Sequence, residues 1–279
     1  MRLLVSMLGL FIIAQLLGMF TGAVVINDIE KNPYASSMVM TNNAEDPMNA
    51  VFFILYILLG AVVMVLLIRK FAMFPIIFRI MEFMMIASAG SIAIYAILRL
   101  VLDYEISTIL AIILALVFSA LRLKFPELKN AAAIMATAGV GTVFGISLGL
   151  MPLILFLVLL SIYDFLAVFK TKHMVEMANF VVQKNMAFTV TATAPPTKMG
   201  QKEQRIDLGT GDMVAPIMLE VATMAFKPAA TPFVFAGAVI SFGLFIGLVY
   251  KKKMVLPALP PIVAGMIVAL LIGFIFGFY

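Results

Sequence analysis

Long apolar segments, separated by short polar or charged stretches, occupy most of this 279-residue chain. A helix needs about 17 or more mostly apolar residues to cross the hydrocarbon core of a bilayer. The pattern therefore predicts an all-α polytopic membrane protein. Its first helix is preceded by one basic residue, Arg2, and is expected to be an uncleaved signal anchor. The nine predicted transmembrane helices are Leu3–Ile26, Ala50–Ile68, Phe83–Leu102, Ile106–Leu121, Ala131–Leu150, Met151–Phe169, Leu208–Phe226, Ala229–Tyr250 and Val255–Phe278.

Three polar segments interrupt the apolar pattern. Ile26–Asn49 contains four acidic residues and predicts an external loop. Phe71–Glu82 predicts either an interfacial lead-in to the third helix or a solvated start of that helix, in which Arg79 and Glu82 form an ion pair three residues apart. The third segment gives the expected division of one integrated membrane domain: helices 1–6 with the first candidate aspartate in residues 1–169, a cytoplasmic gating loop in 170–207, and helices 7–9 in 208–279.

The basic residues predict the orientation of the helices. With a cytoplasmic N terminus, all but three of the 19 lysines and arginines lie on the cytoplasmic side. The exceptions are Lys31, Arg99 and Lys227. The positive-inside rule therefore predicts a cytoplasmic N terminus and, after nine spans, an external C terminus. The net charge of +5 marks topology, because the basic residues flank apolar segments and form no single patch for nucleic acid.

The 170–207 loop contains two segments with recognisable patterns. His173–Val182 is amphipathic. Ala187–Ala194 is short, contains several β-branched residues and ends before two prolines, which is typical of a strand followed by a break.

Composition limits the chemistry that this chain can perform. Hydrophobic residues make up 64% of the chain and charged residues 12%, with a mean hydropathy of +1.17. The absence of cysteine excludes disulfides and thiolate chemistry, and the single histidine, His173, gives neither a catalytic triad nor an imidazole zinc site. No metal or other cofactor is expected. Aspartate and glutamate remain as the acid–base groups.

Two aspartates lie inside predicted membrane helices at similar depths. Asp164 is six residues before Lys170, and Asp212 is seven residues after Arg205. At about 1.5 Å per residue, both lie roughly 9 Å inside the cytoplasmic face. A carboxylate in hydrocarbon costs several kcal/mol, so a pair at matched depth indicates function. Because the two helices are consecutive and antiparallel, packing them together brings both carboxylates into one crevice.

A pair of neighbouring carboxylates has a well-defined chemistry. The two groups share one proton, because like charges at short distance disfavour double ionisation. The ionised member can draw a proton from water while the protonated member polarises a carbonyl, as in aspartic proteases. Asp164 and Asp212 therefore predict peptide hydrolysis.

The residues around the aspartates predict a surface for a peptide. Gly209 and Gly211 have no side chains and let a backbone come close to Asp212. Pro257-Ala258-Leu259 begins the last helix at about 6 Å depth on the same face. Two further prolines follow, so this segment is either irregular or a helix initiated by proline.

Other polar and small residues have structural interpretations. Glu220 lies roughly 12 Å deeper than Asp212 and is expected to bond another helix, with Arg99 as a possible partner. Glycines spaced four apart predict helix-packing surfaces. They are Gly141, Gly145, Gly149, and Gly243, Gly247.

Three short motifs resemble those of a known family. Tyr163-Asp164, Gly209-Thr210-Gly211-Asp212 and Pro257-Ala258-Leu259 resemble the YD, GxGD and PAL motifs of the presenilin and signal peptide peptidase family of intramembrane aspartyl proteases. Motif order and the nine-helix plan match over essentially the whole chain. The deduced orientation is similar to that of presenilins. Prepilin peptidases also use GxGD but lack PAL and typically continue with a lysine-containing stretch, whereas Met213 follows here.

The resemblance implies an intramembrane aspartic endopeptidase that cuts single-span membrane proteins. By resemblance, Asp164 and Asp212 are catalytic, and the 170–207 loop, which is cut during presenilin maturation, is the gate. Thr210 departs from the family's usual apolar residue. The short loops are similar to those of a compact prokaryotic (archaeal-type) presenilin homologue that works without accessory subunits in the cell membrane; oligomerisation stays open. The implied substrate-binding residues are Tyr163, Gly209, Gly211, Pro257, Ala258 and Leu259.

Two further expectations concern mechanism. A helical peptide bond is shielded, so we expect an unwound substrate to add as a strand to Thr189–Thr193, through Val190, Thr191 and Ala192. The alternative from another class is an ion or proton channel or transporter that uses the same acids. The absence of clear inverted repeats, and the position of the acids near one face, favour the protease.

Overall fold

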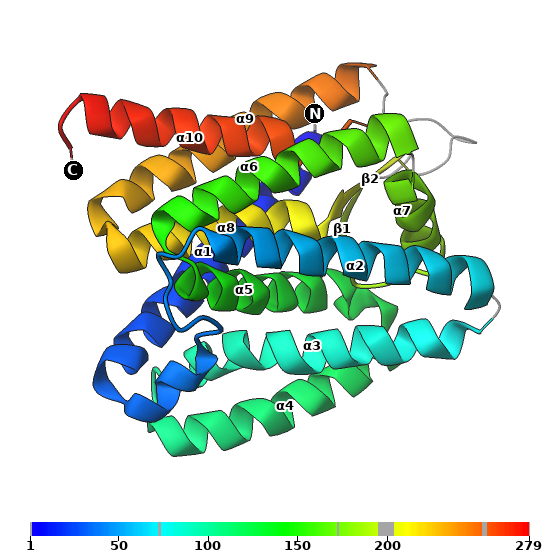
Figure 1. Ribbon diagram of the computed structural model, residues 1–279. Coiled ribbons are helices and arrows are strands. Elements are labelled where there is room, and N and C mark those ends of the chain that lie inside the picture. The colour runs from blue at the N-terminus through cyan, green and yellow to red at the C-terminus, as the bar shows by residue number, and fades with distance from the viewer. Residues whose placement is uncertain (1, 72–73, 172, 195–203, 253–255, 279) are drawn as a thin grey trace.

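The computed structural model describes residues 2–71, 74–171, 173–194, 204–252 and 256–278, and these residues form a bundle of helices with one small sheet (Figure 1). Three short 3₁₀ helices and a π-helical turn, Ala167–Thr171, connect the longer elements. The helices are α1 (Arg2–Lys31), α2 (Met48–Phe71), α3 (Pro75–Leu98), α4 (Tyr104–Lys124), α5 (Lys129–Ser147), α6 (Leu150–Leu166), α7 (His173–Gln183), α8 (Thr210–Phe226), α9 (Thr231–Lys252) and α10 (Leu259–Ile275), and the strands are β1 (Thr189–Ala194) and β2 (Gln204–Gly209).

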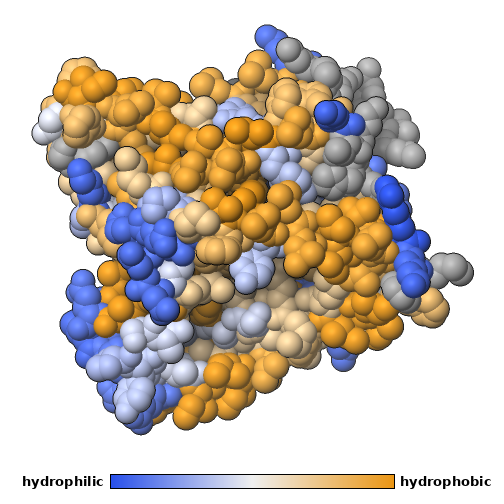
Figure 2. Space-filling model, in the orientation of Figure 1, coloured by the Kyte–Doolittle hydropathy of each residue, from blue (hydrophilic) through white to orange (hydrophobic). Residues whose placement is uncertain are grey.

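Seven of the described helices, α1 to α6 and α9, are long and apolar enough to span a membrane. The other two predicted spans correspond to α8 and α10, which have 17 residues each. Figure 2 shows hydrophobic residues across the middle of one face and strongly hydrophilic residues toward the two ends of the helices. The chain is therefore an integral, multi-pass membrane protein.

The centre of the bundle is built from α1, α5 and α8, which approach closely at glycines. Every residue of α8 from Ala215 to Thr223 is buried. A Cβ at Gly18 of α1 or at Gly141 of α5 would lie within 2.5 Å of the Ile217 side chain. One turn further along α8, Gly22 and Gly145 meet Val221 in the same way. Small residues thus let three backbones pack together.

The predicted glycine surfaces are only partly correct. Gly141 and Gly145 form the expected packing surface, but only a distant Leu8 atom lies near a Cβ built at Gly243, and nothing lies near one at Gly247. The close approach of α9 to α10 instead occurs at two other glycines. A Cβ at Gly237 would lie 2.7 Å from the Gly265 carbonyl oxygen.

The polar end of α1 corrects two expectations. The predicted external loop begins only after Lys31, because α1 continues as helix through that residue. Asp28 is buried there, accepting a hydrogen bond from the Tyr95 hydroxyl at 2.5 Å and from Arg99 Nη2 at 2.7 Å. Arg99 is thus the partner of Asp28 and not of Glu220. Both carboxyl oxygens of Glu220 are buried without a partner among the residues described.

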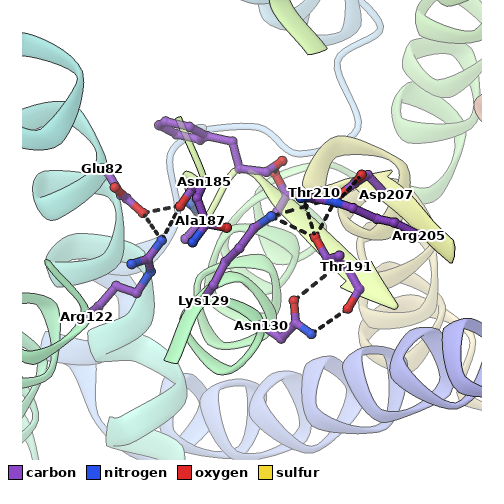
Figure 3. A network of polar contacts seen from close by, with 11 residues as sticks. Glu82, Arg122, Lys129, Asn130, Asn185, Ala187, Thr191, Arg205, Asp207 and Thr210 are labelled. Atoms are coloured by element: carbon purple, nitrogen blue, oxygen red, sulfur yellow. Dashed lines mark hydrogen bonds and ion pairs between the residues drawn. The ribbon is translucent and has the colours of Figure 1, made fainter. Parts of the chain in front are cut away.

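The predicted Arg79–Glu82 pair forms, but the expectation that the pair is solvated is wrong for Glu82. The third helix begins at Pro75, and Glu82 is buried within it. Arg79 Nη1 lies 2.9 Å from Glu82 Oε2, and Arg122 Nη2 of α4 lies 3.1 Å from Glu82 Oε1. The same Glu82 oxygen accepts the Ala187 N–H at 2.7 Å, as Figure 3 shows. Helices α3 and α4 thereby hold the segment that enters β1.

Replacing Arg122 by methionine tests this buried contact. The change removes a guanidinium that is 1% exposed and also bonds the Asn185 carbonyl at 2.5 Å. Since Arg79 still pairs with Glu82, we expect a loss of about 2 kcal/mol of unfolding free energy, measured by denaturation in micelles. The matched variant Arg79→Met removes a partly exposed ion pair and should lose less than about 1 kcal/mol. Equal losses would contradict the buried role of Arg122.

Candidate functional site

One cavity of about 610 Å³ contains both candidate aspartates. It is formed by α6, α7, α8, the start of α10 and both strands, with apolar side chains from α2 and α5. The structure thus brings α6 and α8 together at the depth where their acids lie. The predicted site residues that line this cavity are Tyr163, Asp164, Gly209, Gly211, Asp212, Pro257, Ala258 and Leu259.

Asp164 lies near the C-terminal end of α6 and is 4% exposed. The backbone N–H of Leu259, at the start of α10, interacts with its carboxylate. Oδ2 of Asp164 is buried and has no hydrogen-bond partner among the described residues. Buried polar atoms are nearly always paired, so this oxygen is available to a water molecule or a peptide group.

Asp212 lies in the first turn of α8 and is partly buried. Its Oδ2 packs beside Gly209, where an added Cβ would lie 3.3 Å from that oxygen. Asp164 is close enough to act on Asp212 electrostatically. The two carboxylates therefore face one space from helices that run in opposite directions.

The turn from β2 into α8 is held by Thr210. Its N–H donates to the Phe188 carbonyl at 3.0 Å, and its hydroxyl donates to the same oxygen at 3.1 Å. These two bonds explain why a polar residue, Thr210, lies between Gly209 and Gly211. No atom lies within 4 Å of a Cβ built at Gly211, so the cavity side of this turn is open.

A proline inside α8, Pro216, interrupts the backbone hydrogen bonding of the helix just after Asp212. Pro216 has no N–H and cannot make the helical bond to the carbonyl of Asp212, four residues earlier. The break was not predicted, although Pro216 is a visible signal for it in the sequence. The first turn of α8 therefore lacks one helical bond, and the two bonds from Thr210 to Phe188 add to those that remain.

The segment Pro257-Ala258-Leu259 is buried against the cavity. Each of the two interpretations of this segment is partly correct, because Pro257 and Ala258 are irregular and Leu259 begins a helix with prolines in its first turn. Helix α10 begins at Leu259, and its prolines lie in the first turn, where no helical N–H is needed. The segment therefore positions the backbone N–H of Leu259, the first residue of α10, beside the carboxylate of Asp164.

Helix α7 covers part of the cavity, which sequence reasoning missed. The predicted amphipathic segment forms α7, and Met177, Ala178, Val181 and Val182 line the cavity from it. The π-helical turn Ala167–Thr171 joins it to α6, which carries Asp164. The apolar face of α7 was visible in the sequence, but the surface that it covers was not.

The predicted strand forms, and it has a partner that was not predicted. β1 pairs antiparallel with β2, with Ala192 opposite Ile206 and Thr191 opposite Asp207. Val190, Thr191 and Ala192 are not among the residues that line the cavity, whereas Thr189 is. Asn130 of α5 bonds both backbone groups of Thr191 on the other edge of β1. A substrate strand could pair with β1 there only by displacing Asn130.

Among the residues that the structure describes, no group of three or more histidine, aspartate or glutamate side chains could hold a metal ion.

Known proteins with the same fold share this arrangement of helices. The chain is similar to two solved structures of a presenilin family intramembrane aspartate protease. In the C222 crystal form the identity is 21%, with 98% of this chain and 99% of the other covered and a TM-score of 0.69. In the P2 crystal form the identity is 23%, with 95% of this chain and 97% of the other covered and a TM-score of 0.64. No curated protein matches the chain.

A family model also matches nearly the whole sequence. The model described as signal-peptide peptidase, presenilin aspartyl protease matches residues 8–278. The match includes both aspartates and all three motifs that line the cavity. The chain therefore belongs to the signal-peptide peptidase and presenilin family of intramembrane aspartic endopeptidases.

Proposed function

We propose that this protein hydrolyses peptide bonds within the transmembrane segments of single-span membrane proteins, with Asp164 and Asp212 as the catalytic pair. The observation that carries the proposal is the single cavity that contains both carboxylates, both glycines of the GxGD motif and the PAL segment. The purified protein, reconstituted with a single-span substrate, should release two fragments. An intact substrate under all conditions would contradict the proposal.

The proposed reaction follows from a carboxylate pair that shares one proton. The ionised member accepts a proton from water as the water oxygen attacks the scissile carbonyl carbon. The protonated member donates its proton to the carbonyl oxygen, which gives a tetrahedral intermediate. Proton transfer to the amide nitrogen then breaks the C–N bond. The apolar lining strengthens these electrostatic interactions by excluding other water.

We propose nine spans, with a cytoplasmic N terminus and an external C terminus. The distribution of the basic residues supports this orientation. It puts the cavity at the cytoplasmic third of the bilayer, where water can reach it. The segment 170–207 then acts as the gate, because four side chains of α7 line the cavity. We also propose a prokaryotic origin and activity without accessory subunits, because the loops between the helices are short.

We propose that the substrate enters as an extended strand and pairs with the β1–β2 sheet. The backbone groups of Thr191 point to Asn130, so those of Val190 and Ala192 point to β2. The open edge is therefore that of β2, where Asp207 and Gly209 line the cavity. This modifies the expectation from sequence, in which β1 itself receives the substrate.

Proline substitutions test whether the sheet is required. Ala192→Pro removes a ladder bond to β2, and cleavage is expected to fall at least about tenfold. Val190→Pro should act in the same way. Thr193→Pro is the matched control, because the N–H of Thr193 points away from β2, and its rate should stay within about twofold of wild type. Initial rates of substrate cleavage give the comparison, and similar rates for Ala192→Pro and Thr193→Pro would count against a role of the sheet.

A further inference from the structure

The first turn of α5 closes the outer edge of β1 with a side chain (Figure 3). Asn130 Nδ2 donates to the Thr191 carbonyl at 2.7 Å, and the Thr191 N–H donates to Asn130 Oδ1 at 2.9 Å. A carboxamide offers one donor and one acceptor side by side, as a strand residue does. Asn130 therefore makes the pair of bonds that a neighbouring strand would make with Thr191.

Lys129, the preceding residue, secures the same contact. Its Nζ donates to Thr191 Oγ1 at 2.7 Å and lies 3.9 Å from Asp207 Oδ1. Thr191 Oγ1 in turn donates to Asp207 Oδ1 at 2.5 Å, and Arg205 binds both oxygens of that carboxylate at 2.7 Å. Because Lys129 is 4% exposed, this contact is shielded from water. Both strands are thus fixed to a rigid helix.

The opposite edge of the sheet has no comparable cover. In the antiparallel register, Arg205, Asp207 and Gly209 direct their N–H and C=O groups away from β1. Among the residues described, none from outside the sheet bonds the backbone groups of Arg205 or Asp207. Asp207 and Gly209 line the cavity, and Gly209 precedes Asp212 by three residues. One edge of the sheet is therefore sealed, and the other opens beside the catalytic pair.

We propose that Asn130 is a positioning residue that determines which edge of the sheet a substrate uses. Because Asn130 bonds the N–H and the carbonyl of Thr191, it excludes pairing of a peptide with β1 and directs an extended peptide to β2. An edge strand pairs with any extended chain unless it is covered, so this cover is a specificity device. The proposal rests on the proposed function in that the cavity must receive a peptide.

Disulfide trapping can test the choice of edge, because the chain contains no cysteine. Two single-cysteine variants are compared, one with Ala192→Cys and one with Ile206→Cys, because these positions face each other across the two strands. Each variant also carries the inactivating change Asp164→Asn and is mixed with a synthetic single-span peptide that contains one cysteine. Oxidation with diamide is followed by electrophoresis. With Asn130 intact, the peptide should cross-link to the Ile206→Cys variant at least about tenfold more than to the Ala192→Cys variant.

Asn130→Leu keeps the size of the side chain and removes both bonds. The preference for position 206 should then fall about tenfold. Asn130→Asp, which keeps the acceptor and loses the donor, should give an intermediate ratio and decides the question if the leucine variant does not fold. Asn49→Leu removes a carboxamide bond to the Asn43 carbonyl in the first turn of α2 and should leave the ratio unchanged. Equal trapping at 192 and 206 in the parent, or a ratio that neither Asn130 variant changes, would overturn the proposal.

The trapping result is independent of the proposed hydrolysis. Cleavage of the same peptide is measured in parallel with the active protein. If the edge preference behaves as predicted but no cleavage occurs, the proposed function fails and the assignment of Asn130 stands.

Discussion

Asp212→Asn and Asp164→Asn are each expected to reduce the rate of substrate cleavage by at least about 10³-fold. An asparagine side chain can neither accept the proton of the attacking water nor share a proton with the remaining aspartate. Because the two acids act as a unit, the double variant should be no slower than the worse single variant. Cleavage of a reconstituted single-span substrate, followed by electrophoresis, gives these rates.

The matched control for these variants is Asp103→Asn, which makes the same change at an exposed residue preceding α4. Its cleavage rate should equal that of wild type. Ion flux measured in the same vesicles separates the two classes of function. If the Asp164 and Asp212 variants cleave as fast as wild type but lose ion flux, the acids serve transport and the protease mechanism is wrong.

Gly139→Ala is expected to destabilise the fold by about 3 kcal/mol or to prevent folding. Gly139 lies in α5, and an added Cβ would lie 1.8 Å from the Ala89 carbonyl oxygen of α3. The obstacle is backbone, which cannot move aside as a flexible side chain can, so α3 and α5 would have to separate. The unfolding free energy in detergent micelles measures the change.

Gly60→Ala in α2 is the control for the same substitution. No atom lies within 4 Å of a Cβ built there, and alanine favours helix over glycine. We expect Gly60→Ala to be neutral or stabilising by up to about 1 kcal/mol. A similar loss of stability in both variants would contradict the close approach of α3 to α5.

Hydropathy predicted the helices, because an apolar run is a property of local sequence. Each apolar run became a helix, and counting residues from the charged ends placed Asp164 and Asp212 at one depth. Their meeting in one cavity followed from the antiparallel order of α6 and α8. The first turn of α8 was less predictable, because Leu208 and Gly209 belong to a strand that is set by pairing with β1.

Other features depend on residues that are distant in sequence. Glu82 appeared solvated beside Arg79, yet Arg122 and Ala187 bury it. Strand β2 is short and partly charged, and it forms because β1 supplies its partner. The alternation of polar and apolar residues from Arg205 to Leu208 is the one local signal for it. The contacts of Asn130 with Thr191 join segments 61 residues apart, and no local pattern marks them. Sequence reasoning therefore located the acids but could not determine how the sheet beside them is held.

The most direct test of the account is to map the termini of the products by mass spectrometry after the reconstituted protein cuts a single-span substrate in H₂¹⁸O. Hydrolysis within the membrane predicts new termini inside the substrate's transmembrane segment, with ¹⁸O in the new carboxyl group, and none with Asp164→Asn. Termini found only outside that segment, or the same products from Asp164→Asn, would contradict it.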